Sequence, residues 1–166
     1  MKQTPFLRLI TLLLAVMIAP VFAADAPQMD IDQTVIKLPI DEGVSMDDAI
    51  DSMKLRANNL NFKLVAHQPL YKELESMGLE TKRIEIFQFC DARIAKAMID
   101  FNPSFSAYLP CRITLLEDPD GSRWLITMNL DMFIASANLP DSLHEKAIRV
   151  RDTIKSIMEA GASGDL

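Results

Sequence analysis

The sequence predicts an α+β domain: an antiparallel sheet covered by helices, with a long C-terminal helix packed on the sheet. Between Cys111 and Phe133, two apolar runs that alternate in hydrophobicity flank Asp118-Pro119-Asp120-Gly121. That tetrapeptide has turn chemistry at every position, so the stretch predicts a β-hairpin, which we place at the centre of the sheet. The remaining predicted strands and helices do not alternate regularly, which favours α+β over a parallel α/β fold.

The two strands of this hairpin each show period-two patterning. Alternation places one side chain in two on the same face of a strand, so each strand is expected to bury one face. The residues expected to face the core are Cys111, Ile113 and Leu115 in the first strand, and Trp124, Ile126, Met128 and Leu130 in the second.

Local signals predict the elements before the hairpin. Ser45 and Asp48 form a capping-box-like start for a helix that follows at 3.6-residue spacing. Gly78 and Asn102-Pro103 are helix-ending signals. The predicted elements are a strand at 34–38, a helix at 46–59, a strand at 62–67, a short helix at 70–77, a strand at 82–89 and a helix at 91–101, followed by a loop at 103–110.

After the hairpin, residues 131–138 show no regular pattern and predict irregular structure. A last helix then opens at Pro140 and Ser142, where Ser142 and Glu145 have capping-box spacing. A broad apolar stripe continues along this helix, and Gly161 is expected to end it.

The first 23 residues predict a secretory signal peptide. Lys2 and Arg8 precede an apolar run that is too short to span a bilayer, and Ala23 ends a small-residue cleavage pattern. We therefore expect residues 24–42 to form a leader and first strand, residues 43–162 to form a single α+β domain, and the mature protein to be periplasmic or secreted.

The charge balance limits the expected partners. The formal net charge is −6, and it falls to −8 when the predicted signal peptide and its two basic residues are removed. An acidic protein is a poor ligand for nucleic acid or for an anionic membrane surface. We expect neither nucleic acid nor, after cleavage, membrane as a partner.

Cys90 and Cys111 are the sharpest pair of candidate residues. Free cysteines are usually buried small hydrophobes, but an oxidising compartment also permits a disulfide, which would close a loop of about 20 residues and contribute roughly 3 kcal/mol. We expect the disulfide. A redox-active pair is the less favoured alternative, in which a thiolate at a helix N-terminus would be activated.

Copper is a weaker alternative for the same residues. Thiol and thioether ligands suit Cu(I), and a set of Cys90, Cys111, Met128 and Met132 would supply both. Methionine more often fills gaps in a core, so we expect no metal or other cofactor.

Arg112, Thr127 and Asn129 are expected to form the polar side of the central hairpin. A solvated sheet face is the simpler interpretation. The functional interpretation is a ligand surface on which Arg112 binds an anion and Asp131 orients it. The chain has no nucleophile elbow and no phosphate-binding glycine loop, so enzymatic activity is the less favoured expectation.

The chain resembles domain-of-unknown-function family 302 across roughly residues 43–161. The resemblance rests on residues 44–65, residues 84–98, Leu109-Pro110-Cys111-Arg112-Ile113 and Leu116–Gly121, while residues 127–132 resemble a secreted subgroup with two cysteines. Asn61 and Asp91-Ala92 depart from the usual family pattern. The resemblance implies a TATA-binding-protein-like fold and homodimers, including strand-swapped ones, but no established activity.

Together these patterns predict a periplasmic domain that binds a small molecule or a protein, in a crevice between the central hairpin and the last helix. The alternative is a thiol/disulfide or copper-linked redox accessory protein that uses Cys90 and Cys111.

Overall fold

The computed structural model describes residues 29–165, so the predicted signal peptide lies outside the described residues. These residues form a five-stranded sheet in the order β1-β5-β4-β3-β2, and every neighbouring pair is antiparallel. The strands are β1 (Val35–Pro39), β2 (Lys63–Gln68), β3 (Ile84–Cys90), β4 (Cys111–Glu117) and β5 (Arg123–Met128). The predicted hairpin is β4–β5, and β4 is the central strand.

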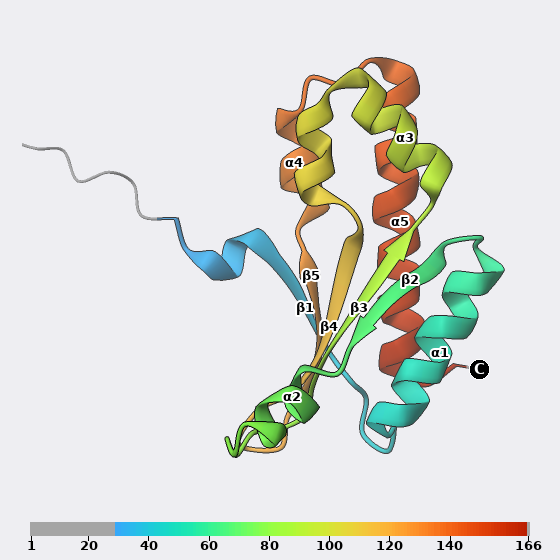
Figure 1. Cartoon of the computed structure of the whole chain (residues 1–166). Helices are drawn as coiled ribbons and strands as arrows, with labels where there is room; N and C mark the ends of the chain where they lie inside the picture. The colour runs from blue at the N-terminus through green and yellow to red at the C-terminus, as the bar shows by residue number, and fades with distance from the viewer. Residues whose placement is uncertain (1–28, 166) are drawn as a thin grey trace, which may run out of the picture.

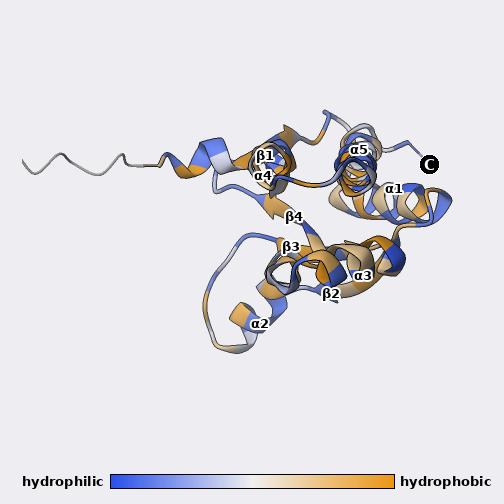
Figure 2. Ribbon diagram, turned by 90° about the horizontal axis from the view of Figure 1, so that it is seen from above, coloured by the Kyte–Doolittle hydropathy of each residue, from blue (hydrophilic) through white to orange (hydrophobic). Residues whose placement is uncertain are grey.

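Helices cover one face of this sheet and one of its ends (Figure 1). The two longest, α1 (Met46–Asn59) and α5 (Asp141–Ser163), lie side by side on the same face, and Figure 2 shows them together on one side of the strands. The shorter helices are α2 (Leu70–Ser76), α3 (Ala92–Phe101) and α4 (Leu130–Ser136), with 3-10 helices η1 (Ile31–Thr34) and η2 (Pro103–Tyr108). The predicted fold class is confirmed. No helix among residues 29–165 is both long and apolar enough to cross a bilayer.

The main core lies between the sheet and the pair α1–α5. Alternate residues of the three central strands point toward these helices, because neighbouring strands in register place paired residues on the same face, and five of these residues are completely buried. The buried strand residues are Phe87, Phe89, Ile113, Leu115 and Leu125, and they pack with helix residues that include Met53, Ile154 and Ile157. We call the opposite side of the sheet the open face.

The prediction for the buried face of β5 is wrong. The register pairs Leu115 with Leu125, so Leu125 faces the helices and Trp124, Ile126 and Met128 lie on the open face. Trp124 is held there because its Nε1 donates to Asp118 Oδ2 at 2.8 Å and Lys37 Nζ lies 4.1 Å from the ring centroid. The open face is itself rich in apolar residues, so the alternation of hydrophobic residues in β5 does not show which of its two faces the helices cover.

Helix boundaries follow local capping in some places and depart from it in others. The Ser45–Asp48 capping box is present, and Asn129 caps a helix, α4, in the segment expected to be irregular. The Ser142–Glu145 capping box is wrong, because α5 starts at Asp141 after Pro140 and has no side-chain cap. Gly161 lies inside α5, and Gly164, with a φ of +72°, follows the helix end instead.

Candidate functional site

A cavity lies at the end of the sheet where β3 and β5 finish and β4 begins. Four helical segments close over these strand ends: α3, η2, α4 and the first half of α5 (Figure 1). We call them the helical cap, and the space that they enclose, of about 310 Å³, the cap cavity. Its volume lies at the lower end of the range that small-molecule sites occupy in proteins.

Local sequence signals position the helical cap over the strand ends. Directly after β3, the Asp91 side chain accepts hydrogen bonds from the amides of Arg93 and Ile94, which starts α3 at once. Such a cap satisfies amides that the first helical turn leaves without partners. Asn102 caps η2 in the same way, and η2 then returns the chain to β4.

The wall of the cap cavity is mainly apolar. Two of its polar members are hydrogen-bonded within the protein: Asn102 accepts from the Ser104 amide at 2.9 Å, and Ser136 Oγ donates to the Met132 carbonyl at 2.9 Å. Asp91 caps α3 and lies 3.9 Å from Arg149. The apolar members include Phe89, Ile94, Ala95, Met98, Phe101, Phe105, Leu109, Met128, Leu130, Phe133, Ile134, Ala147 and Val150.

Both candidate cysteines line the cap cavity as free thiols, so the expected disulfide is absent from this structure. Cys111 pairs across the sheet with Phe89, so these two side chains share one face. Cys90 is the next residue after Phe89 in the strand, so its side chain points to the opposite face from that of Cys111.

Neither thiol is activated. Burial raises the pKa of Cys111 to about 11, with a further contribution from Cys90. Burial and the charge of Asp91 raise the pKa of Cys90 above its ordinary value. The activation that a helix N-terminus would give Cys90 is therefore outweighed, and both groups are protonated thiols at neutral pH.

The structure places one of the four sulfur residues of the copper alternative, Met132, apart from the other three. Met128 lines the cap cavity with the two cysteines, but Met132 is 42% exposed and does not line it. Within residues 29–165, no three His, Cys, Asp or Glu side chains lie close enough together to hold a metal ion.

The expected polar surface on the hairpin is divided between several places. Arg112 lies on the open face, whereas Thr127 is buried on the helix-covered face and donates to the Arg112 carbonyl at 2.6 Å. Asn129 caps α4, and Asp131 pairs with Arg151 at 2.9 Å. The expectation that Asp131 orients Arg112 is wrong, because Arg151 on α5 takes that carboxylate.

Two further hollows adjoin these residues. The first, of about 410 Å³, lies between β1, β5 and α5, where the crevice was expected. Its charged rim is already paired, Arg151 with Asp131 and Asp152, and Lys155 with Glu159. The second, of about 350 Å³, lies on the open face beside Arg112, and we call it the open-face groove.

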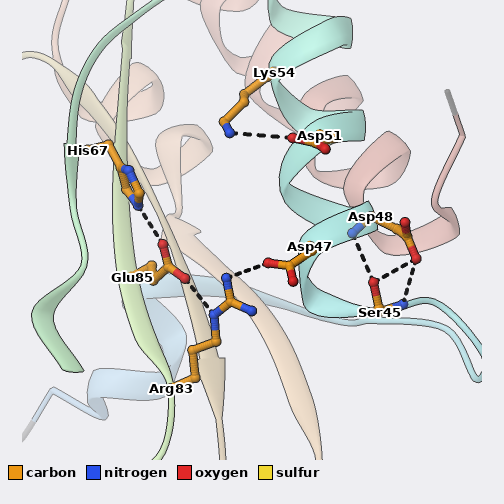
Figure 3. Close-up of polar contacts among 8 residues, drawn as sticks. All are labelled: Ser45, Asp47, Asp48, Asp51, Lys54, His67, Arg83 and Glu85. Atoms are coloured by element: carbon orange, nitrogen blue, oxygen red, sulfur yellow. Dashed lines mark hydrogen bonds and ion pairs between the residues drawn. The ribbon is translucent and has the colours of Figure 1, made fainter. Parts of the chain in front are cut away.

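Sequence reasoning did not find a polar chain at the opposite end of the sheet (Figure 3). Glu85 is only 3% exposed, and its two carboxylate oxygens lie 2.5 Å from His67 Nε2 and 2.5 Å from Arg83 Nε. Arg83 also donates to Asp47 on α1 at 2.7 Å, so the chain connects β2, β3 and α1. The sequence does place Arg83, Glu85 and Phe87 on one face of the strand. It does not show that Glu85 contacts His67, because these two residues are 18 positions apart in the chain.

Comparisons with known proteins agree with this fold. The family profile described as "Domain of unknown function DUF302" matches residues 36–161. A crystal structure of an uncharacterized conserved DUF302 protein from Bacillus stearothermophilus superposes with a TM-score of 0.65 at 16% sequence identity, covering 76% of this chain and 97% of that one. At that identity the likeness concerns the fold alone. No curated protein matches the chain.

Proposed function

This chain belongs to the DUF302 family, and we propose that it is a periplasmic, non-enzymatic protein that binds a small and largely apolar molecule in the cap cavity. The observation that carries the proposal is a preformed cavity of about 310 Å³ with a mainly apolar wall. Among residues 29–165, no buried side-chain nitrogen or oxygen lacks a hydrogen-bond partner. A ligand that offers apolar surface gains free energy there without leaving buried polar groups unpaired.

The cap cavity is a better candidate than the crevice beside α5. The α5 crevice is rimmed by five charged side chains that pair with one another, and a ligand would have to compete with those pairs for its polar contacts. A ligand in the cap cavity does not have to break ion pairs, because the burial of apolar surface alone supplies the driving force for binding.

The periplasmic location in the proposal is supported by the pattern of residues 1–23. The test is the mass of the protein recovered from a periplasmic extract, which should correspond to a chain that begins at Ala24. An intact N-terminus in the cytosolic fraction would contradict this part of the proposal.

Filling the cap cavity tests the binding site itself. Ala95 and Ala97 are both half-buried on α3, but only Ala95 lines the cavity. With the neutral fluorescent probe N-phenyl-1-naphthylamine, we expect Ala95→Leu to weaken binding about tenfold and Ala97→Leu to leave it within about twofold, since the added methylenes occupy the site in only one variant. Equal effects of the two substitutions, or no binding of the probe by the wild type, would contradict the proposal.

A further inference from the structure

An arginine without a charged partner lies beside the cap cavity. Arg112 is exposed on the open face of β4, where the residue paired with it on the neighbouring strand β3 is Gln88. Among residues 29–165, no carboxylate pairs with its guanidinium, whereas Arg83, Arg149 and Arg151 each lie against an aspartate. In a chain with a net charge of −6, an unneutralised cation beside a cavity is available to an anion.

Arg112 lines the open-face groove, and its surroundings there are uncharged. The described residues around the groove include Thr114, Ile126 and Tyr108, and Arg112 is the only charged residue among them. An anion in the groove would therefore meet a guanidinium and no carboxylate. Guanidinium geometry also matches a carboxylate in a bidentate arrangement.

The open-face groove and the cap cavity adjoin. Five residues line both: Tyr108, Cys111, Met128, Leu130 and Phe133. The ring centroids of Tyr108 and Phe133 lie 5.0 Å apart at this junction. Cys111 lines both spaces, whereas the next residue, Arg112, points to the open face and lines only the groove, because consecutive residues of a strand point to opposite faces.

We propose that the ligand is a small amphiphile with an anionic head group, whose apolar chain lies in the cap cavity and whose head group binds Arg112 in the open-face groove. This inference rests on the proposed function, because it requires the cap cavity to hold the apolar part. It adds the chemical class of the ligand: a carboxylate attached to a short hydrocarbon chain, rather than a neutral apolar molecule.

A matched pair of ligands separates the two claims. Decanoate and 1-decanol have the same chain length and differ in head-group charge, so the ratio of their affinities measures recognition of the anion. We would measure both by calorimetry at neutral pH and low salt for the wild type, Arg112→Gln, Arg112→Lys and Arg93→Gln. Arg93 is the control because it is exposed on α3 and lines neither the cavity nor the groove.

We expect Arg112→Gln to lower the ratio of decanoate to decanol affinity about fivefold, as befits one charge contact near solvent. The affinity ratio of Arg112→Lys should stay close to that of the wild type, and the ratio of Arg93→Gln should equal it. Added salt should reduce the ratio in the wild type. If both ligands bind and Arg112→Gln leaves the ratio unchanged, or weakens both ligands equally, the inference is overturned and the proposed function stands. If neither ligand binds the wild type, the proposed function fails as well.

Discussion

At the scale of single residues, Glu85 shows how the sheet accommodates a charge on its apolar face. Glu85 is 3% exposed, and each of its carboxylate oxygens has one partner, His67 on the edge strand β2 or Arg83 directly before β3. Removing one partner of a buried ion pair leaves a charge without compensation, which costs more than the intact pair contributes.

Arg83→Met is therefore expected to lower the free energy of unfolding by about 2 kcal/mol, since His67 retains one oxygen of Glu85 while the other loses its partner. Urea denaturation measures the change. Lys82→Met is the control: Lys82 is half-exposed and pairs with Glu117 at 3.3 Å, so its loss should cost less than about 0.5 kcal/mol. Equal costs for the two substitutions would show that the chain at Glu85 has no special role.

The exposed end of the same chain predicts a pH dependence. A hydrogen bond from Arg83 and its positive charge lower the pKa of Asp47 below 3.8. A carboxyl whose pKa is lower in the folded state stabilises the fold above its unfolded pKa, and this contribution disappears as pH falls through the folded pKa. The stability difference between the wild type and Asp47→Asn should thus be largest at neutral pH and shrink below about pH 4. A difference that is constant with pH would contradict the assignment.

The two thiols are expected to differ in reactivity. Because burial raises the pKa of Cys111 to about 11 while Cys90 is nearer to solvent, iodoacetamide at mildly alkaline pH should modify Cys90 first in the folded protein. Peptide mass spectrometry measures both rates, and in guanidinium chloride they should become similar. Faster modification of Cys111 in the folded state would contradict the placement of these residues.

At the scale of elements, Gly161 shows how closely α1 and α5 approach. A Cβ at Gly161 would lie 2.6 Å from Met53 Cγ, 2.9 Å from Leu125 Cδ1 and 3.2 Å from the Ala49 carbonyl. Glycine in a helix interior costs about 1 kcal/mol relative to alanine, so the contact between the helices and the sheet outweighs helix propensity here.

Gly161→Ala is expected to destabilise the protein by about 2 kcal/mol, because overpacking exceeds the gain in helix propensity. Thermal denaturation of the variant measures the effect. Met53→Ala removes the closest atom, so the double variant should lose less than the sum of the two single changes. A higher Tm for Gly161→Ala would contradict the close packing of α1 on α5.

The elements that the sequence predicted correctly are those with local signals. The turn at Asp118–Gly121 and the Ser45–Asp48 capping box depend on residues within a few positions of each other, and both are present. The face of β5 could not be predicted by alternation, because Trp124 and Ile126 on the open face are as apolar as Leu125 on the covered face. Helix α4 is only seven residues long, too short to show a helical stripe.

At the scale of the whole molecule, the cap cavity is a product of tertiary structure. Its wall joins the ends of three strands to α3, η2, α4 and α5, which are spread over residues 92–163 of the sequence. The sequence did single out Cys90, Cys111 and Met128, which line it, and Arg112, which lies beside it. It did not predict that they meet at one cavity, because that depends on how the helical cap closes over the sheet.

Ligand binding in the cap cavity is tested by titrating the isotope-labelled protein with 1-decanol and following the amide NMR shifts. We predict changes concentrated at the cavity wall, at residues such as Cys90, Met98 and Phe133, with α1 unaffected. Changes confined to the crevice between β1 and α5, or no saturable changes at all, would contradict the assignment of the cap cavity as the binding site.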